Sequence, residues 1–432
     1  MKTIASHTLG CKVNQYDTQA MLELFQKEGY ECVPLSSTAD VYLINTCTVT
    51  GAGDKKSFQL IRRLRRSYPG SLLIVCGCLA QKLGEELLRT GADLVIGTQR
   101  RGDVVRLLDQ VVLTGKPLCA VSPLAEDQPF ERLSISDQTE RMRAVLKIQE
   151  GCSNHCSYCI IPSVRGPVRS RPPEDIAAEV ERLSDAGFRE IVLTGIHLCS
   201  YGRDLSPSVS LLDIIRLVQQ QEGILRIRLG SLEPTVATPD FASALIQCSK
   251  LCPQFHLALQ SGSDSVLARM RRRYNTAQFL QGMENLRRVF PHAAFTTDIL
   301  TGFPGETEEE YRQTCEFIRK AGFARIHVFP YSPRPDTPAA SFPNQLPTGR
   351  KEKQCRELIA LGREVARQYM DSWIGLETVV LPERIENGLW EGYSPEYVRV
   401  SFKNSRNCEA NRPVLVRLTE ADSRGMRGEI IE

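Results

Sequence analysis

The feature that most constrains the fold is a repeated alternation of short apolar runs with amphipathic helical segments, which is typical of parallel sheets with crossover helices. In residues 1–115 the predicted strands are 3–9, 41–45, 72–75 and 94–96. The predicted helices between them are 16–28, 54–67, 84–89 and 103–110, and Asp54 is the expected N-cap of the second. The pattern predicts a doubly wound parallel α/β domain.

The same rhythm returns after residues 116–140, which lose periodicity, turn polar and are predicted to be a linker. Within residues 141–370, six strands are expected at 145–149, 191–194, 225–230, 256–259, 295–300 and 325–329. Six strands and their helices predict a partial, open (β/α)6 barrel, with the chemistry at the carboxyl ends of the strands. A helix over 348–371 then leads to residues 371–432, where β-like runs at 378–381, 397–402 and 413–418 predict a small β-barrel.

Composition narrows the class of protein. The chain has 432 residues, 42% of them hydrophobic and 24% charged, which predicts an α/β multidomain protein. No apolar run approaches the roughly 18 residues that span a bilayer, and the start lacks a signal-peptide core. We therefore expect a cytoplasmic protein with no membrane partner, and a monomer. Its 15 cysteines indicate metal or redox chemistry, because disulfides rarely persist in a reducing compartment.

Three cysteines stand in one short loop directly after the first predicted barrel strand. Cys152, Cys156 and Cys159 form a CxxxCxxC motif. Three thiolates can hold three irons of a cubane cluster and leave the fourth iron open. S-adenosylmethionine chelated there would be prepared for one-electron cleavage to a radical. The alternatives are three core cysteines or a zinc loop, and we interpret His155 within the loop as a bystander.

A second group of cysteines is spread over the first domain. Cys11, Cys47 and Cys78 each follow a predicted strand, so a parallel sheet would bring all three to its carboxyl edge. Three converging thiolates fit a second cluster with a free iron. Cys76 competes with Cys78 for this role, and we favour Cys78 because it lies farther into the loop. The alternative is a set of unrelated buried cysteines.

These motifs give the whole chain a family resemblance. Residues 9–15, 45–50, 76–81 and 151–166 together resemble the methylthiotransferases among the radical S-adenosylmethionine enzymes. The resemblance implies an auxiliary 4Fe–4S cluster on Cys11, Cys47 and Cys78. It also implies a radical-generating 4Fe–4S cluster in the loop after residue 150, two roles for S-adenosylmethionine, and an OB-like TRAM domain that binds RNA at residues 371–432.

The letters Lys12-Val13-Asn14-Gln15 are most similar to the branch that acts on N6-threonylcarbamoyladenosine. This branch implies a radical attack on adenine C2 beside the anticodon, at tRNA position 37, followed by attachment of a methylthio group. The expected partners are the tRNA anticodon loop and an electron donor such as flavodoxin or ferredoxin. Sister branches act on isopentenyladenosine of tRNA or on an aspartate of a ribosomal protein. The non-enzymatic alternatives are an iron–sulfur or zinc RNA-binding protein and an electron carrier.

Cofactor and RNA contacts are expected at residues beside the clusters and on predicted strand ends. The candidate S-adenosylmethionine contacts are Tyr158, Thr194, Gly195, Ser231, Gln260 and Gly302. The candidate RNA contacts are Arg165, Arg169, Arg271, Arg399 and Lys403, with further arginines at 62, 63, 65, 66, 171, 269, 272, 273, 406 and 412. The tail is not basic overall, because residues 371–432 hold eight Lys and Arg against eleven Asp and Glu.

Overall fold

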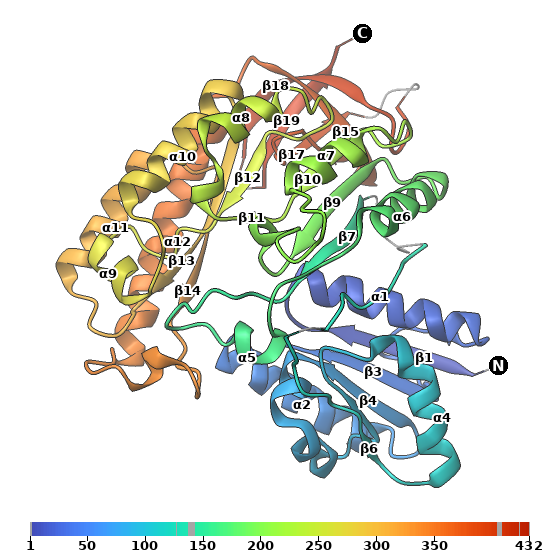
Figure 1. The fold of residues 1–432 in the computed structure, drawn as a ribbon. Helices are drawn as coiled ribbons and strands as arrows, with labels where there is room; N and C mark the ends of the chain where they lie inside the picture. The colour runs from blue at the N-terminus through green and yellow to red at the C-terminus, as the bar shows by residue number, and fades with distance from the viewer. Residues whose placement is uncertain (1, 127, 137–142, 404–407, 423, 432) are drawn as a thin grey trace. The chain divides into compact units, whose positions relative to one another are not determined.

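The computed structural model describes residues 2–126, 128–136, 143–403, 408–422 and 424–431 (Figure 1). The chain divides into two compact units. Unit 1 contains residues 1–186, 193–211 and 332–340, and unit 2 contains residues 187–192, 212–331 and 341–432. The division does not follow the predicted linker, because the strand after the linker belongs to the same unit as the N-terminal sheet.

Unit 1 is built on a six-stranded parallel sheet in the order β2-β1-β3-β4-β5-β6. Its strands are β1 (Thr3–Thr8), β2 (Glu31–Cys32), β3 (Val41–Thr46), β4 (Leu72–Gly77), β5 (Leu94–Ile96) and β6 (Leu118–Cys119). The sequence patterns found four of these strands and missed β2 and β6, since two residues are too few to show periodicity. The strand order reverses between β1 and β3, the kind of switch point where open α/β sheets bind ligands.

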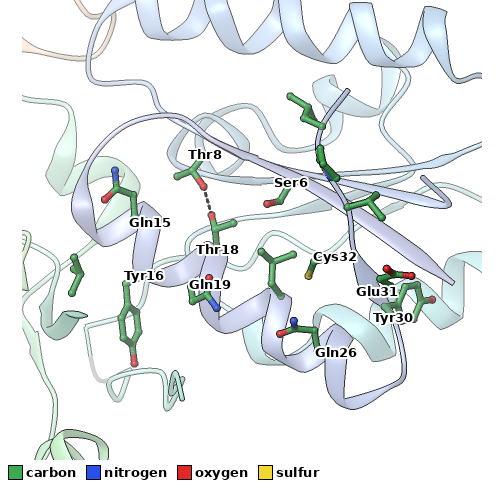
Figure 2. Close-up of a pocket in the computed structure, with 15 residues that line it drawn as sticks. Ser6, Thr8, Gln15, Tyr16, Thr18, Gln19, Gln26, Tyr30, Glu31 and Cys32 are labelled. Atoms are coloured by element: carbon green, nitrogen blue, oxygen red, sulfur yellow. Dashed lines mark hydrogen bonds between the residues drawn. The ribbon is translucent and has the colours of Figure 1, made fainter. Parts of the chain in front are cut away.

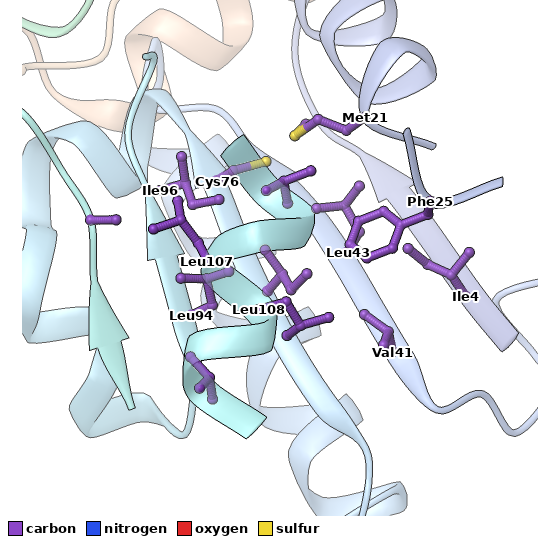
Figure 3. Close-up of a cluster of buried hydrophobic side chains, with 14 of the residues drawn as sticks. Ile4, Met21, Phe25, Val41, Leu43, Cys76, Leu94, Ile96, Leu107 and Leu108 are labelled. Atoms are coloured by element: carbon purple, nitrogen blue, oxygen red, sulfur yellow. The ribbon is translucent and has the colours of Figure 1, made fainter. Parts of the chain in front are cut away.

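Helices cover both faces of this sheet, as the doubly wound prediction requires. On one face, α1 (Lys12–Lys27) and α4 (Val104–Thr114) pack Phe25, Leu107 and Leu108 against the strands (Figure 3). Burying side chains of this size contributes roughly 1.5–3 kcal/mol each. The other face carries α2 (Gly51–Ser67), α3 (Cys78–Leu83) and the 3₁₀ helix η1 (Gly84–Thr90).

The expected N-cap of α2 was wrong. Thr50 caps the helix, because its side-chain oxygen accepts a hydrogen bond from Gly53 N at 3.1 Å. Asp54 lies within the first turn instead, where its carboxylate pairs with Arg334. The helix therefore begins three residues before the predicted start, with a threonine supplying the oxygen that the first turn needs.

The rest of unit 1 surrounds the strand β7 (Arg143–Glu150), which pairs antiparallel with β8 (Arg169–Ser170). Between these strands lies the helix α5 (Ile161–Arg165), and α6 (Pro173–Asp185) follows them. Part of the predicted linker is firmly packed, since Leu133 and Ile135 are buried and the Leu133 carbonyl accepts a hydrogen bond from Tyr16 Oη at 2.8 Å.

Strands β7 to β14 form two four-stranded sheets rather than the single six-stranded array that the sequence predicted. The sheet of unit 2 is parallel and has the order β11-β12-β13-β14. Its strands are β11 (Ser231–Leu232), β12 (Gln254–Leu257), β13 (Ala294–Thr301) and β14 (Arg325–Pro330). The preceding strands β9 (Glu190–Gly195) and β10 (Arg226–Leu229) belong to the other sheet, and a single parallel bridge joins Ile227 to Leu251.

Helices alternate with the strands of unit 2. They are α7 (Leu211–Gln219), α8 (Pro239–Leu245), α9 (Asp264–Arg269), α10 (Thr276–Val289), α11 (Glu308–Ala321) and α12 (Thr348–Asp371). Capping boxes start α10 at Asn275 and α11 at Thr307, which explains their sharp beginnings. The bounds of α12 match the prediction. In the described part of the chain, no helix is both long and apolar enough to cross a bilayer.

The tail of unit 2 closes into a five-stranded barrel in the order β15-β16-β17-β19-β18. Its strands are β15 (Glu377–Glu386), β16 (Leu389–Tyr393), β17 (Arg399–Lys403), β18 (Val414–Ala421) and β19 (Met426–Ile430). Trp373, Trp390 and Phe402 fill its core. The sequence missed β16 and β19, and Tyr397 was wrongly placed in a strand, since its positive φ of 66° puts it in a turn.

Candidate functional site

The three dispersed cysteines of unit 1 meet at the carboxyl edge of the sheet. Cys11 follows β1, Cys47 follows β3, and Cys78 begins α3 directly after β4, and these three strands are neighbours. Gly10 lets two of the loops approach, because its φ is +106° and an added Cβ would lie 3.2 Å from Cys47 Sγ. The sheet topology therefore gathers thiols that are far apart in sequence.

The electrostatics of these thiols show how close they are. Burial, opposed by the nearby Arg165, raises the pKa of Cys78 to about 12, and the neighbouring Cys11 and Cys47 contribute in the same upward direction. Burial also raises the pKa of Cys47, with a contribution from Cys11 in the same direction. Three neighbouring thiolates would repel one another, so a bound metal centre would stabilise the ionised site.

The three cysteines offer the soft sulfur donors that an iron–sulfur cluster needs. Within the described residues, no three His, Cys, Asp or Glu side chains lie close enough to share one ion. Cys11, Cys47 and Cys78 contribute sulfur alone, the ligand that iron–sulfur clusters prefer. Cys76 is fully buried in the apolar cluster that also contains Leu94 and Ile96 (Figure 3), and the choice between Cys76 and Cys78 stays a prediction.

The CxxxCxxC motif occupies an irregular loop between β7 and α5, also in unit 1. The loop is closed at its base, where Cys152 N donates to the Gly166 carbonyl at 3.0 Å. Gly151 is required there, since its φ is +73° and an added Cβ would lie 1.7 Å from a backbone oxygen of Pro167. Cys152, Cys156 and Cys159 are partly accessible, and His155 is exposed. The loop thus presents three thiols on a fixed base.

Cys78 of the first group packs against the segment that follows the CxxxCxxC motif. Cys78 packs with Ile160 and Val164 of the segment that follows Cys159. Thr98 Oγ1 also donates a hydrogen bond to the Val164 carbonyl at 2.8 Å. The start of α3 and the segment after β5 therefore both contact the segment that follows Cys159, within unit 1.

The structure adds two residues that sequence reasoning did not place in the site. Asn14 donates its side-chain amide to the carbonyls of Leu9 at 2.7 Å and Thr46 at 3.0 Å, and so ties the Cys11 loop to the Cys47 loop. Arg165 donates its Nε to Cys78 Sγ at 3.2 Å. Asn14 lies within the motif that suggested the family, but Arg165 had been interpreted as an RNA contact.

The candidate S-adenosylmethionine residues fall in both units. Unit 1 holds Tyr158, Thr194 and Gly195, and an added Cβ at Gly195 would lie 2.7 Å from Gln149 Oε1. Unit 2 holds the other three, Ser231, Gln260 and Gly302.

Local packing explains part of the unit 2 set without a ligand. Gly302 has a φ of +72°, donates its N–H to Glu306 Oε2 at 2.8 Å, and lies against the Lys351 side chain. Gln260 also has a positive φ, 73°, and its backbone bridges to Asp298 and Leu300. Ser231 is exposed. Turn geometry thus accounts for Gly302, and ligand contact stays a prediction for all six residues.

The structure contradicts the RNA prediction for Arg165 and Arg169. Arg165 is completely buried and Arg169 is 3% exposed, so a phosphate cannot reach either guanidinium. Arg171 is buried in the same way and pairs with Glu179.

Some of the other arginines also have structural roles. Arg65 donates to the Gly91 carbonyl and pairs with Asp93, Arg269 pairs with Glu310, and Arg399 pairs with Glu391 and Glu386. Arg271 and Lys403 are exposed and stay candidates, as are Arg62, Arg63 and Arg66 on α2. Arg406 lies outside the described residues.

A separate open cavity of about 880 Å³ runs along α1 and β1 in unit 1. Ser6, Thr8, Gln15, Tyr16 and Cys32 are among the residues that line it, and Thr8 Oγ1 bonds to Thr18 Oγ1 across 2.8 Å (Figure 2). None of the six candidate cluster cysteines lines this cavity. This cavity is therefore not the place where the thiols converge.

Comparison with known proteins identifies the family. Residues 146–318 match the radical SAM superfamily, and residues 3–97 match the uncharacterized protein family UPF0004. A relative from Bacillus subtilis, threonylcarbamoyladenosine tRNA methylthiotransferase MtaB, is 41% identical over 94% of this chain and 92% of its own length. The chain belongs to the radical S-adenosylmethionine methylthiotransferase family. It is therefore an enzyme that transfers sulfur-containing groups.

Two further similarities fit this methylthiotransferase assignment. The tRNA-2-methylthio-N(6)-dimethylallyladenosine synthase of Syntrophobacter fumaroxidans is 34% identical over 98% of this chain and 94% of its own length. The solved structure of the radical S-adenosylmethionine methyltransferase TsrM from Kitasatospora setae has a TM-score of 0.55 at 14% identity, covering 95% of this chain and 84% of that one. At that identity the likeness supports the fold alone. The family uses a 4Fe–4S cluster and S-adenosylmethionine.

Proposed function

We propose that this methylthiotransferase converts N6-threonylcarbamoyladenosine at position 37 of tRNA to its 2-methylthio derivative. The observation that carries the proposal is the presence of both three-cysteine groups in unit 1, with Cys78 packed against Ile160 and Val164, which follow Cys159. The CxxxCxxC cysteines suit the radical-generating cluster of the family. Cys11, Cys47 and Cys78 suit a second cluster that would donate sulfur. The name of the Bacillus subtilis relative, at 41% identity, supports the threonylcarbamoyl substrate over the dimethylallyl one.

In this proposal, Cys152, Cys156 and Cys159 hold the cluster that, when bound, supplies the electron for S-adenosylmethionine cleavage. Cys11, Cys47 and Cys78 hold the auxiliary cluster, whose free iron would carry the sulfur to be transferred. The protein's own contribution is positional: Asn14 joins two ligand loops, and the closed base at Gly151 and Gly166 fixes the third. An unactivated aromatic carbon offers no acid–base route, so the chain needs to orient the reactants rather than to supply a general base.

We also propose that RNA is bound partly by exposed cations of unit 2. Arg271 and Lys403 have no ion-pair partner among the described residues. The barrel carries more acidic than basic residues, so any grip on phosphates must come from such local positions. An electron donor such as flavodoxin or ferredoxin, a monomeric state and a cytoplasmic location complete the proposal.

Mass spectrometry of tRNA nucleosides tests the substrate. The chain is expressed in a host that lacks methylthiotransferases, and a matched strain carries the empty vector. We expect 2-methylthio-N6-threonylcarbamoyladenosine to accumulate only with the chain. Appearance of 2-methylthio-isopentenyladenosine instead would assign the dimethylallyl branch, and absence of both products would direct the search to an aspartate of a ribosomal protein.

Cysteine variants test the two cluster roles separately. Cys156→Ala is expected to abolish both S-adenosylmethionine cleavage and methylthiolation. Cys47→Ala is expected to retain cleavage, measured as 5′-deoxyadenosine, and to lose methylthiolation. Methylthiolated product from either variant would contradict the assignment of its cluster.

A further inference from the structure

We propose that Arg165 is a positioning residue for the auxiliary cluster: its buried guanidinium holds the Cys78 sulfur and joins that ligand to both ends of the CxxxCxxC loop. The inference rests on the proposed assignment of Cys11, Cys47 and Cys78 as cluster ligands. It gives a role to an arginine that the sequence had suggested for RNA.

All three nitrogens of the guanidinium are engaged. Nε donates to Cys78 Sγ at 3.2 Å, and one terminal nitrogen donates to Glu150 Oε1 at 2.8 Å and Oε2 at 3.1 Å. The other terminal nitrogen donates to Asn14 Oδ1. Because the fork of a guanidinium is planar and rigid, these contacts fix the Cys78 sulfur relative to Glu150 and Asn14.

These partners belong to the candidate site itself. Asn14 ties the Cys11 loop to the Cys47 loop, and Glu150 ends β7 two residues before Cys152. Arg165 ends α5, six residues after Cys159. One buried side chain therefore connects the ligand loops of the sheet edge with the start and the end of the CxxxCxxC loop.

Arg165 is part of a larger buried charge network. Lys147 Nζ donates to Asp17 Oδ1 at 2.5 Å and to Glu150 Oε2 at 3.0 Å, and Arg101 pairs with Asp17. Arg165, Lys147 and Arg101 all donate to the Glu150 carboxylate, so three cations converge on this one side chain.

The charges of this network nearly cancel before the thiolates are counted. Three cations, Lys147, Arg101 and Arg165, face the carboxylates of Asp17, Glu150 and Glu131. Thiolates at the three ligand positions would add negative charge, and Arg165 is the cation of this group that touches a sulfur. Hydrogen bonds to sulfur and nearby positive charge both raise the reduction potential of an iron–sulfur cluster.

The test separates the two clusters before it changes Arg165. A chain with Cys152, Cys156 and Cys159 replaced by Ala keeps only the auxiliary cluster, and a chain with Cys11, Cys47 and Cys78 replaced by Ala keeps only the radical-generating one. Arg165→Gln and Arg165→Lys are introduced into each. Iron and sulfide per chain are then measured after anaerobic reconstitution, together with a redox titration followed by electron paramagnetic resonance.

We expect Arg165→Gln to lower the midpoint potential of the auxiliary cluster and to change its resonance line shape. Arg165→Lys keeps the charge without the fork, so its potential should lie between those of Gln and wild type. The radical-generating cluster should keep its potential in both variants. Arg171→Gln is the matched control, because Arg171 is 3% exposed and pairs with Glu179 and Tyr16 but contacts no cysteine.

An auxiliary cluster with wild-type potential and line shape in Arg165→Gln would overturn the inference. An equal change in Arg171→Gln would also overturn it, since any lost buried arginine would then suffice. If Arg165→Gln does not fold, the potential and line shape of Arg165→Lys decide in the same way. If Cys11, Cys47 and Cys78 are not cluster ligands, the result is different: the chain with these three cysteines replaced would bind as much iron as the wild-type chain.

Discussion

Arg228 is expected to be the main anchor of the C-terminal barrel. From β10 it donates to Glu190 Oε1 at 2.7 Å and to the carbonyls of Pro395 at 2.6 Å and Ser394 at 2.9 Å. Its guanidinium also lies 4.5 Å from the centroid of the Tyr397 ring. Tyr397 therefore helps to hold the barrel.

Replacing Arg228 with Met would remove these contacts and leave Glu190, which is 4% exposed, with a weaker partner. The remaining ion pair joins Glu190 to Arg226 across 3.8 Å. Removing one partner of a buried ion pair costs about 3–5 kcal/mol of folding stability. Because the Arg226–Glu190 pair remains, we expect a loss near the lower end of this range. With a urea dependence of about 1–3 kcal/mol per M, the unfolding midpoint should fall by roughly 1–3 M.

The assay is urea unfolding followed by tryptophan fluorescence. The chain has two tryptophans, Trp373 and Trp390, and both lie in the barrel core, so the signal reports this element selectively. Arg384→Met is the matched control, because that arginine is 66% exposed in its pair with Glu386 and its loss should leave the unfolding midpoint almost unchanged.

A double variant tests the electrostatic part of the argument. Replacing Arg228 with Met and Glu190 with Leu together removes the buried carboxylate as well as its partner, so part of the lost stability should return. If Arg228→Met shifts the tryptophan transition no further than Arg384→Met does, the anchoring role is refuted. If the double variant is no more stable than Arg228→Met, the buried carboxylate is not the source of the loss.

Three further predictions concern other parts of the chain. Burial raises the pKa of Glu306 from 4.5 to about 7, so ionising this carboxyl destabilises the folded state. This destabilisation is absent below pH 4.5 and complete above pH 7. Glu306→Gln should therefore gain about 3 kcal/mol on wild type between those pH values in urea unfolding, and a pH-independent difference would contradict this. Gly302→Ala should destabilise the chain more than Gly305→Ala. Both glycines have a φ of +72°, but an added Cβ meets another side chain at 2.4 Å only at Gly302. Equal unfolding midpoints of the two variants would exclude this steric effect. Cys76→Ala should keep the iron content measured after reconstitution while Cys78→Ala lowers it, and the reverse result would exchange their roles.

The sequence predicted the regular elements well where the pattern was long enough. The bounds of α12 and β5 agree with the prediction, because a 24-residue amphipathic helix and a short strand between turn signals leave few alternatives. Strands of two residues, such as β2 and β11, were missed because no periodicity exists over that length. Antiparallel pairing of β8 with β7 was also missed, since pairing depends on tertiary contacts.

The cysteines of the candidate site could be selected from sequence because each stands just after a strand. The buried arginines could not, because arginine is normally exposed and its partners here are distant in the chain. Arg165 meets Asp17, 148 residues away. One signal was present: Asp17 lies on the buried face of α1, among Val13, Ala20 and Met21, where a charged residue requires a partner.

The buried charge network also sets an order of events during synthesis. Asp17 leaves the ribosome long before Arg165, and at about 5–20 residues per second the interval is on the order of ten seconds. Until Lys147 and Arg165 emerge, the N-terminal sheet has a carboxylate on its buried helix face with only part of its counter-charge. The nascent sheet should therefore reach its full stability only after these two residues have been synthesised.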